Sequence, residues 1–528
     1  MTSTADPLLP ARPTRYEAWR RRMAGDLALQ RRMGWLAPLL VTLLAALLRL
    51  TGLGHPHAIV FDETYYVKDA WSQWLLGYAA TWPEDANERF AGGETDIFDD
   101  GASFAVHPPL GKYLIGAGMA LFGAESSFGW RIAVALAGTA AVLLLYLIAK
   151  ELTGSLVFAV VASGLLAIDG LAIVMSRVAI LDMILTAFVL LAFWFVLLDR
   201  RRHLDRLAAA LTARPQGCAP PWWGPVLWNR PWLLAAGAAG GAASAVKWSG
   251  LWVLAALGLY VVITDAFARR RLGIALWPVD AVRQGAASFV LMIPLAFAVY
   301  LASWTGWLLS DGGYDRHAAD DSPATGFFAW VPMWAQNLWA YHQSIYVATA
   351  EITTAHPYSS PAWQWPLLIR PTSMYAANTA DGTAGCASAS GCIEVLYSMP
   401  NPLIWWGGMA AVLWLAVRFV RSRHWRDGVV LLGIVATYVP WLLYPERTIF
   451  QFYTVLMLPF VILALTFALR AIAGEAHAPQ HRRAVGTRIA GVILAVIVGL
   501  SVFWMPLWTA VQVPMEFYWM HAWLRTWI

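Results

Sequence analysis

Two adjacent carboxylates closely follow the first long apolar run of the sequence. Asp62 and Glu63 lie in "FDETYYVKDA" (residues 61–70), just after "WLAPLLVTLLAALLRLTGL" (residues 35–53). A carboxylate can take a proton from an attacking hydroxyl when it lies within hydrogen-bond reach of that hydroxyl. A loop that leaves a membrane also needs polar residues, so the pair alone fits either a catalytic site or a solvated loop.

The next polar motif favours chemistry. "FAVHPPLGKYLIG" (residues 104–116) combines His107 and Lys112 with two prolines, which fix backbone dihedrals, and with Gly111, which permits a close approach. This pattern predicts a rigid segment that presents a histidine and a cation.

Further charges lie where apolar runs are expected to reach the same face of a membrane. They are Arg131, Arg177, Asp182, Lys247 and Arg447. Charges at bilayer depth are costly unless they are paired or line a cavity, so each is either a functional residue or half of a structural ion pair, such as Arg177 with Asp182. Several cations beside an acid pair indicate an anionic substrate, and arginine suits phosphate oxygens. The combination matches glycosyl transfer from a polyprenyl phosphate.

The composition indicates what must position these residues. Of the 528 residues, 59% are hydrophobic and 13% are charged, which predicts an all-α polytopic membrane protein, because helices satisfy their own backbone groups in lipid. We expect about 11 transmembrane helices, at 36–53, 131–150, 155–173, 180–198, 231–247, 250–267, 284–303, 402–418, 428–444, 450–469 and 488–507.

The basic residues predict the orientation. Most of the 37 Lys and Arg residues fall in loops that are cytoplasmic if the N-terminus is cytoplasmic and the C-terminus is outside. We therefore expect four parts. They are a cytoplasmic tail (1–34), a transmembrane catalytic module (35–303) with a large outer loop of short helices (54–130), a second outer loop on the acceptor side (304–401), and a four-helix transmembrane region with an outer tail (402–528).

The cysteines fit this topology. Cys386 and Cys392 lie in the second outer loop, where a disulfide is plausible and two free thiols are the alternative, whereas Cys218 lies on the inner side. A zinc site would need two more ligands, which the neighbourhood does not offer.

Several functions are disfavoured. The sequence has no Walker-type loop, Rossmann glycine fingerprint, H-E-x-x-H zinc motif or Gly-x-Ser-x-Gly nucleophile elbow. Its basic residues form no patch interleaved with stacking aromatics, so nucleic-acid binding is not expected.

A set of ordered motifs then resembles one family. The motifs are "FDETYYV", "HPPLGKYLI", "WRIAVALAGT", "AIDGLAIVMSRVAILDM", "AVKWSGL", "HPYSSPAWQWPLLIRP", "NPLIWWGG" and "ERTIFQFYTVLMLPF". Together they resemble the bacterial protein O-mannosyltransferases of the GT-C superfamily. The resemblance implies a GT-C fold and inverting transfer of mannose from polyprenyl-phosphate mannose to Ser or Thr hydroxyls of exported proteins, which the secretion machinery could deliver.

The resemblance also implies residue roles. Asp62 would be the general base and Glu63 would orient it or contact the acceptor, with the reverse assignment left open. His107 and Lys112 would lie near the donor, and Arg131 would bind the phosphate or position the acid pair.

The remaining candidates are expected on charge, location and motif. Arg177, Lys247 and Arg447 are donor-site candidates. The acceptor groove would contain His356, Tyr358, Trp363 and Trp365, although aromatic residues at a membrane interface are often only anchors.

No essential cofactor is expected. Other GT-C enzymes hold a divalent ion, and "DIFDDG" (96–101) could supply oxygen ligands from Asp96, Asp99 and Asp100, but a solvated loop is the preferred interpretation. The sequence lacks the inserted soluble domain of the eukaryotic members, so their pairing into dimers is not carried over. The scarcity of lysine suggests a GC-rich bacterial genome, which predicts the inner cell membrane with the active site on the outer, periplasmic face.

Two other functions remain possible from the sequence. The first is another GT-C transferase that moves a lipid-linked sugar to a glycolipid or a cell-wall glycan, but "AHPYSSPAWQWPLLIRP" favours a protein acceptor. The second is a transporter, for which charges would line a path across the membrane, whereas here they gather at one face.

Overall fold

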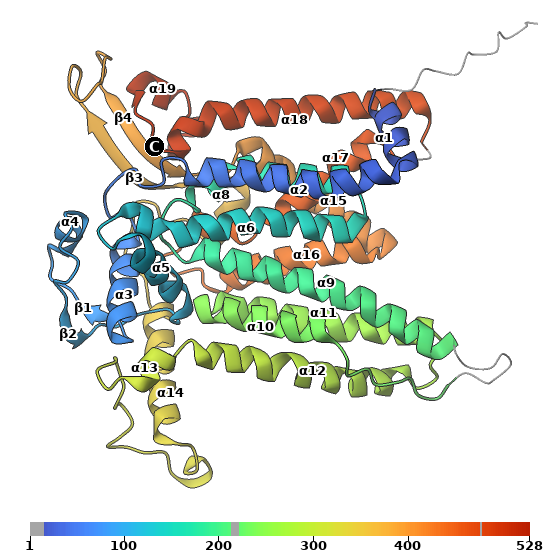
Figure 1. Cartoon of the computed structure of the whole chain (residues 1–528), viewed down its shortest axis with the longest axis horizontal. Coiled ribbons are helices and arrows are strands. Elements are labelled where there is room, and N and C mark those ends of the chain that lie inside the picture. Colours follow the sequence, from blue (N-terminus) through green and yellow to red (C-terminus); the bar gives the residue numbers. More distant parts are fainter. Residues whose placement is uncertain (1–14, 213–220, 476–477, 528) are drawn as a thin grey trace, which may run out of the picture.

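Long helices packed side by side form the body of the protein (Figure 1). The computed structural model describes residues 15–212, 221–475 and 478–527, so Cys218 and residues 1–14 of the predicted tail lie outside the described residues. Eight helical segments are long and apolar enough to cross a membrane. They are α2 (Leu27–Leu50), α6 (Ser127–Thr153), α9 (Asp182–Thr212), α11 (Ser249–Arg271), α12 (Trp277–Ala302), α15 (Pro402–Ser422), α16 (Trp425–Tyr438) with the 3-10 turn η3 (Val439–Leu443), and α18 (Gln480–Trp508). The chain is therefore a multi-pass membrane protein, as predicted.

Three shorter apolar helices occupy the other predicted spans. They are α7 (Leu156–Ile168), α10 (Pro231–Val246) and α17 (Leu458–Ala473). Each predicted span thus coincides with a helix, but because these three are short, the count of eleven membrane crossings stays a prediction. Two more helices precede or interrupt this series, α1 (Arg15–Gly25) and α8 (Gly170–Val174).

Small residues let α10 pack closely against α12. A Cβ atom at Gly237 would lie 2.3 Å from the Met292 carbonyl oxygen, and one at Gly241 would lie 2.3 Å from that of Ala296. Glycines four residues apart give a flat helix face that a neighbouring backbone can approach. This contact fixes the end of α10, where Lys247 follows.

Most of the short elements lie at one end of the bundle, which we call the site end (Figure 1). They include the helices α3 (Glu63–Leu76), α4 (Ala86–Ala91), α5 (Leu110–Phe122), α13 (Thr305–Leu309), α14 (Met333–Ala350) and α19 (Met515–Trp519). The 3-10 turns are η1 (Gly326–Phe328), η2 (Ala362–Leu367), η4 (Gln451–Val455) and η5 (Arg525–Trp527). The arginine runs at residues 200–202 and 269–271 lie in the C-terminal half of α9 and in the last turn of α11, away from the site end. The positive charge of these arginines therefore lies toward the end of the bundle opposite the site end.

Two small antiparallel sheets also lie at the site end, and the sequence analysis did not anticipate them. One pairs β1 (Ala80–Thr81) with β2 (Asp99–Ala102), and the other has the order β3 (Thr372–Thr379), β4 (Cys392–Ser398), β5 (Val513–Pro514). Cys386, in the connection from β3 to β4, forms a disulfide with Cys392, the first residue of β4. The disulfide considered from the sequence is therefore present.

Candidate active site

Asp62 lies at the start of α3, immediately before its first residue. Its side chain is half-buried, and within the described part of the chain its carboxylate has no hydrogen-bond or ion-pair partner. Burial raises the pKa of Asp62 from 3.8 to about 6, a shift that Lys247 opposes and Asp182 reinforces. An uncommitted carboxylate with this pKa can accept a proton near neutral pH.

The residue before it fixes the direction of this carboxylate. Phe61 has a positive φ of 48°, which is uncommon outside glycine. Its ring packs edge-on against Phe450 and Phe452, with centroid distances of 5.5 and 5.6 Å. The aromatic contacts hold the backbone turn that presents Asp62, a role that no motif indicated.

Glu63, the other member of the acid pair, has hydrogen-bond partners at both carboxylate oxygens. Oε1 accepts from Arg131 Nε at 2.8 Å and Oε2 accepts from Arg131 Nη2 at 2.9 Å. The backbone amides of Val60 and Ala179 donate to the same carboxylate at 3.0 and 2.7 Å. Glu63 therefore ties the loop before α3 to α6 and to the segment that leads into α9.

Arg131 has no N–H group left for a ligand. Besides its two bonds to Glu63, it donates to the backbone carbonyls of Leu53, Pro56 and Ala58. These contacts use all five N–H groups of the guanidinium, and the side chain is completely buried. Of the two roles considered from the sequence, the geometry fits positioning of the acid pair and not phosphate binding.

Arg177 also faces inward. It donates to the carbonyls of Leu48, Arg49, Thr51 and Gly52 at the end of α2, with its two shortest bonds at 2.7 Å. These are carbonyls that a helix end leaves without intrahelical partners. Arg177 therefore caps α2 and does not pair with Asp182, and none of these contacts faces a donor site.

Asp182 pairs instead with Lys247. Lys247 Nζ lies 2.9 and 3.0 Å from the two carboxylate oxygens of Asp182. The pair joins the start of α9 to the end of α10, and Nζ also lies 4.8 Å from the ring centroid of Tyr453. Because both charges act on Asp62, the pair sets the electrostatic environment of the free carboxylate.

The His107 and Lys112 motif packs against α3. Lys112 Nζ lies 3.2 Å from Asp69 Oδ2, and the His107 ring stacks on Tyr66 with centroids 6.1 Å apart. Burial, together with the nearby cations, holds the pKa of His107 well below its ordinary value, so this ring is neutral.

Asp62, Tyr66 and Asp69 share one face of α3. Tyr66 and Asp69 were not among the predicted site residues, although spacings of four and three residues on a helix would have placed them with Asp62. Gly111 allows the approach of α5 to this site, since a Cβ atom there would lie 2.7 Å from Leu181 Cδ2.

A cavity of about 480 Å³ opens at His107 and Lys247. Its lining includes His107, Lys247, Arg447 and Tyr453. Within the described residues, the Arg447 side chain has no hydrogen bond and no acidic partner, and its guanidinium lies 5.5 Å from the ring centroid of Trp441. Arg447 is therefore a cation available to an anion that enters this cavity.

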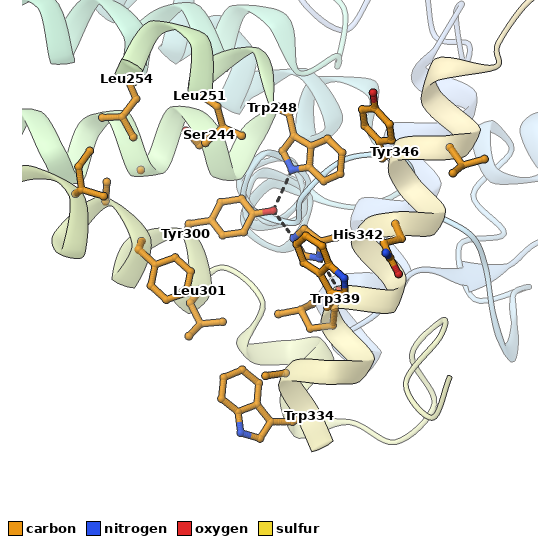
Figure 2. A pocket seen from close by; sticks show the side chains of 18 residues that line it. Ser244, Trp248, Leu251, Leu254, Tyr300, Leu301, Trp334, Trp339, His342 and Tyr346 are labelled. Carbon is orange, nitrogen blue, oxygen red and sulfur yellow. Dashed lines mark hydrogen bonds between the residues drawn. The ribbon is translucent and has the colours of Figure 1, made fainter. Parts of the chain in front are cut away.

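A second, larger cavity adjoins the first. It has a volume of about 820 Å³, is almost entirely apolar, and lies between α10, α11, α12 and α14 (Figure 2). Trp248, Leu251 and Tyr346 line both cavities. One cavity with cations and one without charges lie side by side, which suits an amphiphile with an anionic head.

Two family models and several known proteins match this chain. A family model described as "Dolichyl-phosphate-mannose-protein mannosyltransferase" matches residues 106–211, and one described as "C-terminal four TMM region of protein-O-mannosyltransferase" matches residues 334–527. The polyprenol-phosphate-mannose–protein mannosyltransferase of Mycobacterium tuberculosis is 31% identical over 509 residues, which cover 94% of this chain and 93% of that protein. The chain belongs to this mannosyltransferase family. The protein of the same name from Corynebacterium glutamicum is 29% identical over 500 residues, 92% of each chain.

A solved structure shows the fold of the family. In the Saccharomyces cerevisiae protein O-mannosyltransferase Pmt1-Pmt2 complex bound to the sugar donor, the matching chain has a TM-score of 0.70 at 15% identity, covering 98% of this chain and 94% of that chain. The GT-C fold expected from the sequence is confirmed.

The acceptor candidates of this mannosyltransferase divide into two kinds. His356 is exposed, with its ring 5.8 Å from that of Phe61, beside Asp62, and 6.0 Å from that of Tyr358. Trp363 is exposed, whereas Trp365 is 1% exposed and donates to the Ser360 carbonyl oxygen at 2.8 Å. Trp365 is a core residue with no surface to offer an acceptor, because its large ring fills the space under η2.

The acids of "DIFDDG" do not gather around one point. Asp96 accepts from Trp71 Nε1 at 3.3 Å, while Asp99 and Asp100 are neighbours in β2, where successive side chains point to opposite faces. Among the residues that the structure describes, no group of three or more His, Cys, Asp and Glu side chains could hold a metal ion.

Proposed function

We propose that the protein transfers mannose from polyprenyl-phosphate mannose to Ser or Thr hydroxyls of exported proteins, with inversion at the anomeric carbon. The observation that carries this proposal is the division of the acid pair, which leaves Asp62 free in the field of Lys247, a residue that lines a cavity together with unpaired Arg447. The names of the family's relatives supply the donor and the class of acceptor.

The proposed reaction is a single displacement. The acceptor hydroxyl attacks the anomeric carbon as its proton passes to Asp62, and the bond from that carbon to the phosphate oxygen breaks. Polyprenyl phosphate leaves with the electron pair. Arg447 stabilises the developing charge on the phosphate, and Lys247 and neutral His107 line its path.

Other candidates act indirectly in this proposal. Glu63 and Arg131 are positioning residues, Lys112 acts through Asp69, and Arg177 supports α2. His356, Tyr358 and Trp363 remain as the acceptor surface.

The unequal distribution of arginine supports a location in the bacterial inner membrane with the site end outside. Cytoplasmic loops are the basic ones, and the arginine runs lie at the opposite end of the bundle. Exported chains would then meet the site as they leave the membrane, where the secretion machinery could deliver them.

The test is mannose transfer by purified protein in lipid nanodiscs. The assay combines radiolabelled polyprenyl-phosphate mannose with a Ser/Thr/Pro-rich peptide and compares wild type, Asp62→Asn and the control Asp99→Asn, an exposed acid in the same loop. We expect labelled peptide with wild type and the control, and none with Asp62→Asn.

Two outcomes would contradict parts of the proposal. Label that enters a glycolipid in added lipid extract, but never the peptide, would exclude the protein acceptor. Wild-type activity of Asp62→Asn would exclude Asp62 as the base.

A further inference from the structure

One segment at the site end has no charged residue. Residues 322–350 contain no Asp, Glu, Lys or Arg, although they fall within the predicted second outer loop (304–401). The stretch before it, residues 311–321, contains Asp311, Asp315, Arg316, Asp320 and Asp321. The sequence changes abruptly from charged to uncharged residues shortly before η1 and α14 begin.

Large aromatic side chains of this segment are exposed. Phe327, Phe328 and Trp330 are 82%, 59% and 75% exposed, and Trp334 and Trp339 are 40% and 66% exposed. We call these five residues the aromatic edge. Several large aromatic side chains left exposed in one short segment mark an interaction surface, because leaving them in water is unfavourable.

The aromatic edge is held by a packed support. Leu338, Tyr341 and Ile345 of α14 are buried against Trp304 and Trp307. The Tyr341 hydroxyl also donates to the Ala105 carbonyl oxygen at 3.0 Å and accepts from the Ala105 amide at 3.2 Å. The edge is therefore presented by a fixed helix and not by a loose loop.

The position of α14 points to the surface that the aromatic edge meets. In Figure 1, α14 runs across the site end of the spanning helices and projects past α12. The spanning helix α12 exposes Phe289, Val290 and Phe297, which are 60%, 55% and 63% exposed and face lipid in a membrane. Trp334 and Trp339 line one cavity with Leu301, near the end of α12, so the aromatic edge adjoins this lipid-facing surface there.

We propose that the aromatic edge inserts into the lipid leaflet at the site end, which makes residues 322–350 an interfacial membrane element. Phe and Trp side chains on an uncharged helix and turn suit the boundary between headgroups and acyl chains. The charged stretch 311–321 remains in water above it. Trp334 and Trp339 also line the apolar cavity, whereas Phe328 and Trp330 line neither cavity.

The experiment places spin labels on single cysteines of the full-length protein in nanodiscs of phosphatidylethanolamine and phosphatidylglycerol. Cys218→Ser removes the third cysteine, and Cys386 and Cys392 remain paired. Phe328→Cys and Trp330→Cys are the test positions. Phe297→Cys on α12 is the lipid reference, and Ala389→Cys in the exposed disulfide loop is the aqueous reference.

The measured quantity is the ratio of label collisions with molecular oxygen, which favours lipid, to collisions with a water-soluble nickel chelate. We expect the ratio at both test positions to be several-fold above that at 389 and close to that at 297. A ratio equal to that at 389 would place the aromatic edge in water, as an acceptor surface would be, and would overturn the proposal. Shielding of both test labels from both reagents would overturn it as well, because it would mean that protein, such as a second copy of the chain, covers the edge.

Discussion

The Glu63 carboxylate and the Arg131 guanidinium form a two-point ion pair in which both side chains are completely buried. The two N–O distances are 2.8 and 2.9 Å. Asp62, one residue earlier, has no such partner among the described residues. Adjacent acids in the sequence thus have separate tasks, since one holds the loop in place and the other remains available to react.

Substitution Glu63→Gln should act on stability first. The neutral amide leaves the charge of Arg131 buried without compensation, which costs about 3–5 kcal/mol when one partner of a buried pair is removed. We expect a clearly lower Tm in detergent and a low yield of folded protein, measured beside Asp62→Asn, whose Tm should match wild type. An inactive Glu63→Gln protein with the wild-type Tm would contradict this positioning role.

The pH dependence of transfer should report Asp62. The base acts only when ionised, and burial raises its pKa to about 6, so kcat/KM should rise with pH and level off above that value. Asp182→Asn removes an anion that raises the pKa of Asp62, so the acidic limb of the kcat/KM profile of this variant should move to lower pH. Profiles of kcat/KM against pH for both proteins check this expectation, and a wild-type limb near the ordinary value of 3.8 would refute it.

Arg447→Gln should weaken binding of the donor. Hydrogen bonds to a charged group contribute about 1.5–3 kcal/mol, which corresponds to a rise in donor KM of about tenfold or more. The control is Arg89→Gln, which removes an exposed arginine paired with Glu94 on the first outer loop and should leave KM unchanged. Kinetics with donor and peptide varied separately would decide, since a rise confined to the peptide KM would assign Arg447 to the acceptor.

The apolar periodicity of the sequence predicted where the helices lie, because burial in lipid demands long apolar runs. The partners of the charges could not be predicted in the same way. Arg131, Arg177 and Lys247 looked alike, as cations at helix ends, yet their partners lie more than 60 residues away along the chain. Only packing decides that Arg131 and Arg177 face backbone carbonyls while Arg447 is left for a ligand.

Some of the remaining features could have been predicted from the sequence. Others could not, each for a physical reason. The face of α3 that unites Asp62 with Tyr66 and Asp69 follows from helical spacing and could have been predicted. The small sheets could not, since β1 and β5 have two residues each and gain their strand geometry from their partners. The burial of Trp365 could not be predicted either, because an aromatic residue near a membrane can lie in a core or at an interface equally well.

Tyr300→Phe tests whether the apolar cavity contributes to donor binding. His342 Nδ1 lies 2.6 Å from the Leu338 carbonyl oxygen and must carry a proton, so in the neutral ring Nε2 is an acceptor. The Tyr300 hydroxyl therefore donates to Nε2 at 2.6 Å and accepts from Trp248 Nε1 at 3.0 Å, joining α12, α14 and the turn after Lys247 (Figure 2). Without this hydroxyl, Trp248 loses its partner at the junction of the two cavities, and the KM for the donor should rise several-fold while the pH limb of Asp62 stays in place.

Tyr346→Phe is the matched control, because Tyr346 lines both cavities and its hydroxyl has no hydrogen bond within the described residues. Equal effects of the two substitutions on donor KM would show that the bridge through Tyr300 has no part in holding the donor.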